Sequence, residues 1–157
     1  MVNPSLAGRC GLYCGYCEIH RAYKDSVSVR IQLAKKHRCA PGDIVCEGCQ
    51  RVHARGWSKD PDWGRNCRIL KCLGDRGLRF CYECTQLDSC ELWGDLAEAY
   101  LHLGVDLKEN LRQYKHGRVR KWLEEQDRKW RCAHCGNPMI VSSDFFRCHR
   151  CGKTPDE

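Results

Sequence analysis

Cysteine is unusually frequent in this chain and accounts for 15 of its 157 residues. At such a density, cross-links between cysteines or through metals determine how a short chain folds. Two classes of protein share this composition: secreted domains built on disulfides, and intracellular proteins built on metal sites. The odd number of cysteines favours metal sites, since an odd set cannot pair completely.

The N-terminal sequence also favours metal sites. Residues 1–9 carry neither a basic n-region nor an apolar run of about seven residues, so no signal peptide is expected. No stretch of about 18 apolar residues suggests a membrane span. We therefore expect a cytoplasmic protein without membrane contact, in which thiols stay reduced and free to bind metal.

The clearest motif is a repeated CxxCG sequence near the C-terminus. A CxxC turn directs two sulfur atoms to one point, and two such turns complete a tetrahedron around a metal. Gly136 and Gly152 follow the two pairs, and glycine readily adopts the positive φ that such turns need. We predict a rubredoxin-like β zinc ribbon over residues 131–157, with short strands near 139–141 and 145–146. Its ligands are Cys132, Cys135, Cys148 and Cys151.

A site of four thiolates suits zinc and also iron, and zinc is the favoured occupant. His134 and His149 lie within the two turns. Four cysteines already fill the tetrahedron, so we expect both histidines to be exposed and not to bind the metal.

The remaining cysteines lie in the first 90 residues. Three CxxC pairs are each half of a tetrahedral site, and single cysteines can supply further ligands. Cys39 follows a helix end and has no near partner, so we expect it not to bind metal. His20, His37 or His53 can complete a third site, and the division among sites stays open. The ten candidate ligands are Cys10, Cys14, Cys17, Cys46, Cys49, Cys67, Cys72, Cys81, Cys84 and Cys90.

The metal of these cysteines is either zinc, which we favour, or iron in an iron–sulfur cluster. The spacing of Cys10, Cys14 and Cys17 matches the cluster-binding loop of radical SAM enzymes. The chain is too short for the large α/β barrel that those enzymes need. Disulfide exchange at Cys14 and Cys17 would need a thioredoxin-like βαβ pattern, which does not surround them.

Hydrophobic periodicity predicts an α-rich protein with irregular cysteine loops held together by metal. A first helix is expected over 21–38, with Val27, Ile31 and Ala34 on its apolar face, and a short helical turn over 67–73 stopped by Gly74. A further helix is expected over 91–103, with Trp93, Leu96, Tyr100 and Leu103 at helical spacing on one face. Two more are expected over 106–114, with Asp106 as N-cap, and over 118–129. We divide the chain into a cysteine-rich metal-binding domain (1–90), a helical segment packing on it (91–130) and the ribbon (131–157).

The formal net charge of +7 invites a comparison with nucleic-acid-binding proteins. Each zinc bound by four thiolates lowers that balance by about two units, because the ligands lose their protons. A local basic cluster remains at Arg118, Arg120, Lys121 and Arg128, with Tyr114, Trp122 and Trp130 interleaved. Basic residues with stacking aromatics suit single-stranded nucleic acid. The favoured alternative is that the aromatic residues are core.

The order of the motifs resembles a known family. The residues concerned are Arg9-Cys-Gly-Leu-Tyr-Cys-Gly-Tyr-Cys17, the pair Cys46/Cys49, then Cys67 and Cys72, Phe80-Cys-Tyr-Glu-Cys84, Cys90-Glu-Leu and the stretch 122–130. Together they resemble a family of uncharacterised cysteine-rich proteins of anaerobic bacteria and archaea, described as a domain of unknown function. The resemblance implies that the ten N-terminal cysteines other than Cys39 act as a set, and it implies no activity.

Three functions are therefore considered. The favoured one is a non-enzymatic zinc protein that serves as an adaptor or accessory subunit for a protein partner. The second is an iron–sulfur protein that transfers electrons or handles clusters, and the third binds nucleic acid through the ribbon and residues 118–131. The motifs GxxxxGK[ST], HExxH and GxSxG are absent from the sequence, and we identify no catalytic residues.

Overall fold

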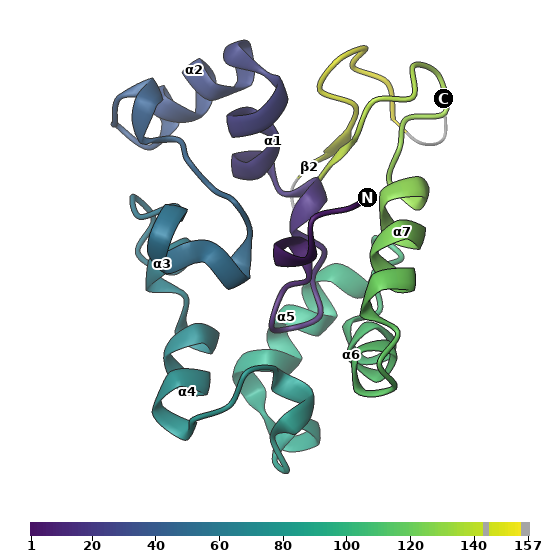
Figure 1. Ribbon diagram of the computed structural model, residues 1–157. Helices are drawn as coiled ribbons and strands as arrows, with labels where there is room; N and C mark the ends of the chain where they lie inside the picture. Colours follow the sequence, from purple (N-terminus) through teal and green to yellow (C-terminus); the bar gives the residue numbers. More distant parts are fainter. Residues whose placement is uncertain (143–144, 155–157) are drawn as a thin grey trace.

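The computed structural model describes residues 1–142 and 145–154. Within them the chain is helix-rich, with seven α-helices, several short 3₁₀ turns and one two-stranded antiparallel sheet. The predicted α-rich fold with a small C-terminal β element is confirmed at this level (Figure 1). The helices are α1 (Glu18–Asp25), α2 (Val27–Lys36), α3 (Val52–Arg55), α4 (Arg68–Arg76), α5 (Glu91–Leu101), α6 (Leu107–Lys115) and α7 (Val119–Lys129), and the strands are β1 (Ile140–Ser142) and β2 (Phe145–Arg147).

The first predicted helix is wrong in one respect, because residues 21–38 do not form one helix. The chain breaks at Ser26, whose backbone is extended and whose side-chain oxygen accepts a hydrogen bond from the Val29 N–H. A serine cap of this kind starts a new helix and ends the old one. The expected apolar face fails as well: Val27 is 70% and Ile31 42% exposed, and of the three only Ala34 is buried.

The Ser26 cap allows a direct test. Ser26→Ala is expected to lower the free energy of unfolding by about 1 kcal/mol, because the first turn of α2 loses a hydrogen-bond acceptor. Chemical denaturation measures the change, with Ser58→Ala at an exposed loop position as the control. Equal losses in the two variants would show that the cap contributes nothing.

The second half of the chain follows its predicted pattern closely. Asp106 caps α6 by accepting a hydrogen bond from the Glu109 N–H at 3.0 Å, as expected. Trp93 and Leu96 are buried on α5, also as expected. In the first half, α4 departs from its prediction, because it continues through Gly74 and ends at Arg76, with Gly77 as the C-cap at a φ of +67°. Glycine lowers helix propensity without terminating a helix, whereas its freedom at positive φ makes it a common final residue.

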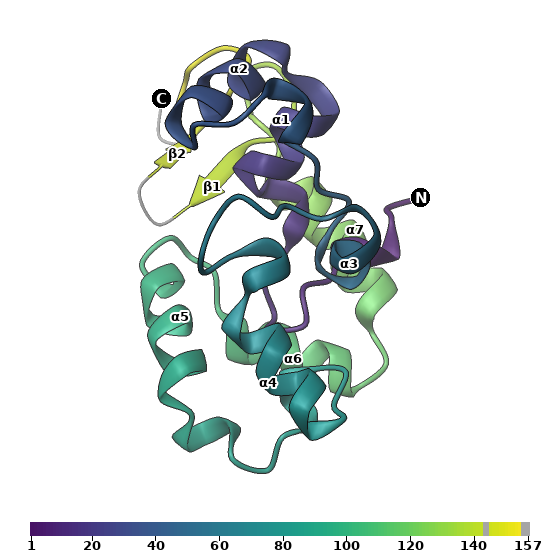
Figure 2. The same ribbon diagram turned by 90° about the vertical axis from the view of Figure 1, so that its left-hand side faces the viewer.

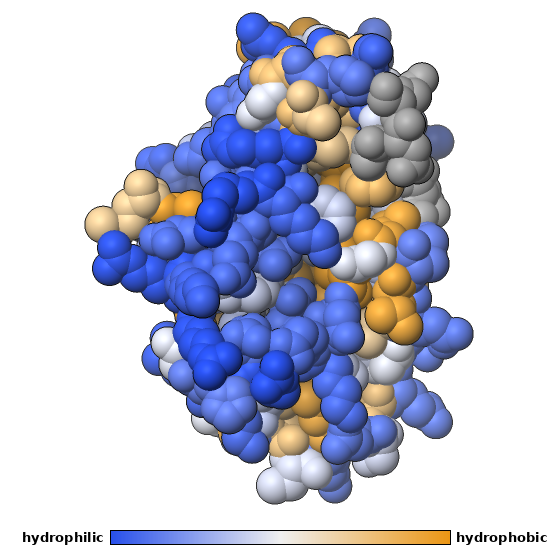
Figure 3. Space-filling view, turned by 90° about the vertical axis from the view of Figure 1, so that its right-hand side faces the viewer, coloured by the Kyte–Doolittle hydropathy of each residue, from blue (hydrophilic) through white to orange (hydrophobic). Residues whose placement is uncertain are grey.

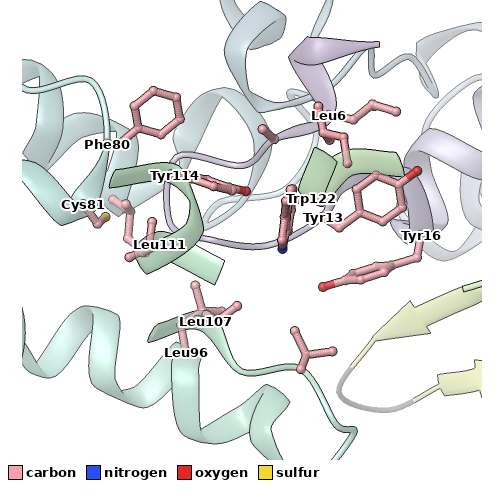
Figure 4. Packing of buried hydrophobic residues seen from close by; sticks show 14 of the residues in the cluster. Leu6, Tyr13, Tyr16, Phe80, Cys81, Leu96, Leu107, Leu111, Tyr114 and Trp122 are labelled. Atoms are coloured by element: carbon pink, nitrogen blue, oxygen red, sulfur yellow. The ribbon is translucent and has the colours of Figure 1, made fainter. Parts of the chain in front are cut away.

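The main hydrophobic core joins the N-terminal loop to α4, α5, α6 and α7. Aromatic side chains from distant parts of the sequence meet edge to face within it (Figure 4). The ring centre of Trp122 lies 4.8 Å from that of Tyr114 and 6.0 Å from that of Tyr13, and Tyr16 lies 5.4 Å from Trp130. Such contacts add to the free energy of burial, so the aromatic residues of α6 and α7 are structural.

A second, smaller core lies under α1 and α2. Its buried members include Ile19, Leu33, Ile44 and Trp57, and Cys17, Cys39 and Cys46 pack against it. Figure 2 shows α1 and α2 beside the β hairpin at one end of the molecule, with α4, α5 and α6 at the other end. The cysteine-bearing loops connect the two ends.

The longest helices in the described residues, α5 and α7, have 11 residues each. A bilayer requires about 20 apolar residues in a helix. No helix in the part of the chain that the structure describes is long and apolar enough to cross a membrane.

Candidate metal centre

The C-terminal hairpin brings four cysteine sulfur atoms together. All the Sγ atoms of this cluster lie within 4.8 Å of one another, with Cys132 and Cys151 3.6 Å apart and Cys135 and Cys148 3.5 Å apart. A zinc ion bound about 2.3 Å from each of four sulfurs requires separations of this size. Within residues 1–142 and 145–154, no other three or more histidine, cysteine or acidic side chains converge as closely. The cluster can therefore hold a metal ion.

Local backbone geometry explains the convergence. Gly136 and Gly152 have φ values of +69° and +74°, and their N–H groups donate to the carbonyl oxygens of Cys132 and Cys148 at 2.8 and 2.9 Å. The predicted role of the two glycines is confirmed. The Arg150 N–H lies 3.4 Å from the Cys148 sulfur, which places a donor where a metal-bound thiolate would accept it.

The electrostatic surroundings of the four thiols differ. Hydrogen bonds from the side chain and backbone of Asn137 lower the pKa of Cys135 to about 6, whereas burial raises the pKa of Cys148 to about 11. Cys132 and Cys148 are buried, while Cys135 and Cys151 are exposed. The site therefore lies at the surface of the molecule with one side sealed by protein.

The expectation that His149 is exposed is wrong. Its side chain is only 3% exposed, and its Nε2 atom lies 3.8 Å from a carboxylate oxygen of Asp25 on α1. The cause is tertiary, because β1 packs against α1 and places this turn of the ribbon against the helix. His134, in the other turn, is exposed as expected.

The ribbon is held to the helices by further contacts. Val141 of β1 belongs to the main core, and Phe146 of β2 packs edge to face on Trp130 with ring centres 5.7 Å apart. The backbone N–H of Met139 donates to the carbonyl oxygen of Trp130 at 2.9 Å. A metal in the ribbon would thus stabilise a hairpin on which part of the main core depends.

The N-terminal cysteines lie near one another without forming so tight a cluster. Burial raises the pKa of Cys14, and the negative charges of Cys49 and Cys46 raise it further. Burial and the charge of Cys46 raise the pKa of Cys17 to about 12. The structure therefore brings the pair Cys14/Cys17 beside the pair Cys46/Cys49.

A second set of neighbours continues from Cys49. Burial raises the pKa of Cys10, and the charges of Cys49, Cys81 and Cys67 add to this effect. The same pattern is seen at Cys49, whose pKa of about 11 reflects burial and then the charge of Cys67. Because the pKa values of these thiols are raised, metal binding must displace a proton from each of them.

The loop that carries Cys10 is fixed by side chains from two helices. Trp93 Nε1 donates to the Cys10 carbonyl, and Asn110 Nδ2 donates to the Gly11 carbonyl, both at 2.9 Å. Gly11 has a φ of +98°, and a Cβ atom there would lie 2.8 Å from the Leu107 carbonyl oxygen. The helices therefore determine where the first cysteine of the set lies.

A third set surrounds a small cavity between α4 and α5. Cys72, Cys81, Cys84 and Cys90 all line it, together with apolar side chains. Burial and the charges of Cys90 and Cys72 raise the pKa of Cys81 to about 12. Sequence spacing had not indicated which cysteines meet here, because Cys72 comes from a different helix.

Three of the N-terminal cysteines occupy the same position relative to a helix. Cys17, Cys67 and Cys90 each follow a short 3₁₀ turn and occupy the N-cap position of α1, α4 and α5, without a capping hydrogen bond from the side chain. The free N–H groups and the dipole at such a position favour a negative charge. A metal-bound thiolate at these positions would lie at the positive end of a helix.

Two other predictions concern residues outside these sets. Cys39 packs against the second core together with Cys17 and Cys46, and its exclusion from metal binding stays a prediction. His20 is buried, and one of its ring nitrogens lies 2.8 Å from the Cys46 carbonyl oxygen. Burial lowers the pKa of His20 to about 4, so the ring is neutral at ordinary pH.

The aromatic residues beside the basic cluster are unavailable for stacking on nucleic acid. Tyr114, Trp122 and Trp130 are each 5% exposed or less. Arg120 and Lys121 are exposed and pair with Glu124 and Glu125 at 3.6 and 3.8 Å. Figure 3, which views the molecule from the side of α7 in Figure 1, shows a largely hydrophilic face with a hydrophobic band. The hypothesis of nucleic-acid binding therefore depends on the basic side chains alone, without aromatic stacking.

The exposed pairs of α7 contribute little to stability. Exposed ion pairs one helical turn apart are worth about 0.3–0.5 kcal/mol. Alanine at Arg120 or Lys121 is therefore expected to change the free energy of unfolding by no more than about 0.5 kcal/mol, measured by chemical denaturation. A loss of several kcal/mol would show that these residues have a structural role that their contacts do not explain.

The fold and the cysteine cluster define a class: helix-rich, cysteine-rich proteins with a four-cysteine group that can bind a metal. The chain belongs to the protein family described as "Protein of unknown function (DUF3795)", whose model matches residues 6–95, more than half of the chain. The match includes all ten N-terminal candidate ligands and ends before the ribbon. No curated protein and no solved structure matched the chain.

Proposed function

We propose that this chain is a non-enzymatic zinc protein whose ribbon holds a structural zinc ion and which serves as an adaptor or accessory subunit. The observation that supports it is the convergence of four thiol sulfurs within 4.8 Å at the C-terminal hairpin. Four sulfur ligands complete a tetrahedron and leave no open position for a substrate or water, as in structural zinc sites. An all-sulfur tetrahedral set is also typical of zinc among the divalent metals.

The exposed side of the ribbon supports the adaptor role. His134 and Arg150 are exposed at the two turns, next to the exposed Cys135 and Cys151. The opposite side of the ribbon is held by α1 and the core. A metal would thus keep the exposed turns in one arrangement, which reduces the entropy lost when a partner protein binds them.

The test uses a double variant, His134→Ala with Arg150→Ala, in the full chain. The change removes exposed side chains and leaves all four sulfur atoms in place, so zinc content should stay the same. A partner that co-purifies with the unaltered chain should be lost. Lys71→Ala, exposed on α4 at the other end of the molecule, is the control and should retain it. Equal recovery of the partner with both variants would contradict a role of the ribbon turns in binding it. Loss of zinc from the double variant would show that His134 and Arg150 are needed for the metal site itself.

We also propose that the N-terminal cysteines bind metal, either zinc or iron–sulfur clusters. Two buried hydroxyl groups support this, because Tyr16 and Tyr114 have no hydrogen-bond partner in the described residues. Burial is the main cause that raises the pKa values of both hydroxyls, and the charges of Cys10 and Cys14 are among the causes that raise them further. Buried donors of this kind require acceptors, which metal-bound sulfurs provide. We propose a cytoplasmic location, because that compartment keeps thiols reduced.

A further inference from the structure

We propose that Cys72, Cys81, Cys84 and Cys90 bind one iron–sulfur cluster in the cavity between α4 and α5. This inference rests on the proposal that the N-terminal cysteines bind metal, and its site is separate from the ribbon. Four cysteines are the usual ligand set of both [2Fe–2S] and [4Fe–4S] clusters. The structure therefore assigns four of the ten N-terminal cysteines to one site, a division that spacing alone left open.

The cavity is the first observation. It has a volume of about 30 Å³ and is lined by all four cysteines. A single water molecule needs about 10–15 Å³, so protein atoms leave a small open space where the four cysteines meet. Its other walls are mainly apolar, including Ile69, Leu73, Leu92 and Trp93. Water finds few polar partners in such a space, whereas the sulfur atoms at its edge can bind a metal.

The spacing of the sulfur atoms favours a cluster over a single ion. In the ribbon, all four donor sulfurs lie within 4.8 Å of one another, as one tetrahedral ion requires. Among the described residues around the cavity, no three donor atoms satisfy that limit. A cluster holds its cysteine sulfurs farther apart than one ion does, because several iron and sulfide atoms lie between them. In this structure no three of the four sulfur atoms are therefore as close together as the ribbon sulfurs, which suit one zinc ion.

The charge of a bound cluster is balanced from two sides. Arg76 directs its Nη1 atom to the Cys84 sulfur at 3.7 Å and donates to the Gln86 side chain at 3.0 Å, which holds it in place. Cys90 occupies the N-cap position of the 11-residue helix α5. Hydrogen bonds to cysteine sulfurs and positive helix ends stabilise anionic clusters.

The experiment is anaerobic reconstitution of the full chain with ferrous iron and sulfide, followed by iron, sulfide and zinc analysis. Cys81→Ser and Cys84→Ser should each lose two to four iron atoms per chain, according to the cluster type. Cys39→Ser, whose thiol lies outside the cavity lining, should lose none. Zinc in the ribbon should be equal in all variants, so a failure of this proposal and a failure of the ribbon proposal give different results.

A second variant keeps the proposal testable if the cysteine variants fold poorly. Arg76→Ala leaves all four ligands in place and should retain the iron. Its cluster should have a more negative reduction potential, because a hydrogen bond to a ligand sulfur stabilises the reduced and more negatively charged state. Electron paramagnetic resonance of the reduced protein, titrated at set potentials, measures the shift.

Three results would overturn the proposal. The unaltered chain could bind no iron after reconstitution. It could bind iron whose amount and spectrum do not change in Cys81→Ser, Cys84→Ser and Arg76→Ala. Its cavity cysteines could instead bind zinc in preference to iron, seen as zinc lost from Cys81→Ser and Cys84→Ser and retained in Cys39→Ser.

Discussion

Cys148→Ser is expected to remove the ribbon zinc and to unfold the described part of the ribbon, residues 131–142 and 145–154. Cys148 is 1% exposed, so a water molecule cannot take the place of the lost sulfur ligand unless the hairpin opens. Structural zinc sites contribute about 10–16 kcal/mol of apparent binding free energy in zinc-finger peptides, far more than a hairpin of two three-residue strands can supply. The helices should remain partly folded, because most of the main core lies outside the ribbon.

The measurement combines zinc analysis with limited proteolysis of the full chain. The variant should bind one zinc fewer than the unaltered chain and should be cut within the ribbon. Cys39→Ser is the matched control, and it should retain both the zinc and the resistance to cutting. A Cys148→Ser chain with unchanged zinc and an intact ribbon would show that the four sulfurs do not act together.

Asn110→Leu is expected to lower the free energy of unfolding by about 2–4 kcal/mol. Asn110 is 8% exposed and links two distant segments, because its Oδ1 accepts from Trp122 Nε1 at 2.8 Å and its Nδ2 donates to the Gly11 carbonyl at 2.9 Å. Leucine has a similar size and leaves both buried partners without a hydrogen bond. Each such group costs about 1–3 kcal/mol.

The effect should also reach the N-terminal metal sites, since Gly11 directly follows Cys10. Chemical denaturation at constant metal measures stability, and elemental analysis measures metal content. Gln32→Leu, an exposed polar position on α2, is the control and should change stability by less than about 0.5 kcal/mol. Similar stability of both variants would show that the buried network is not needed to hold the cysteine loop.

The parts of the structure that were correctly predicted depend on local sequence. The CxxCG pairs place their sulfurs through turns of a few residues, and the two glycines have the positive φ that the motif requires. Asp106 caps α6 through an acceptor only three residues from its donor. Periodicity likewise identified the buried side of α5, because neighbouring turns of one helix share a face.

The features that were not predicted depend on contacts between distant segments. His149 is buried because the ribbon packs on α1, and nothing in the CxxC turn indicates that neighbour. The grouping of Cys72 with Cys81, Cys84 and Cys90 arises where α4 meets the start of α5. The break at Ser26 is a different case, because the serine cap is a local signal but the helical periodicity that continues across it predicts one longer helix.

The ribbon and the cavity site together suggest a division of roles. Zinc in the ribbon would stabilise the C-terminal surface. A cluster between α4 and α5 would add a redox-active group, bound by a separate set of cysteines. The first role suits an adaptor, and the second suits an accessory subunit of a redox partner.

The most direct test of the central claim is zinc X-ray absorption spectroscopy, with element analysis, on the full chain purified without oxygen. The expected result is at least one zinc per chain, coordinated by four sulfur atoms at about 2.3 Å, with one such zinc lost from Cys148→Ser. A chain without zinc, or zinc bound mainly by nitrogen and oxygen, would contradict the four-cysteine metal centre.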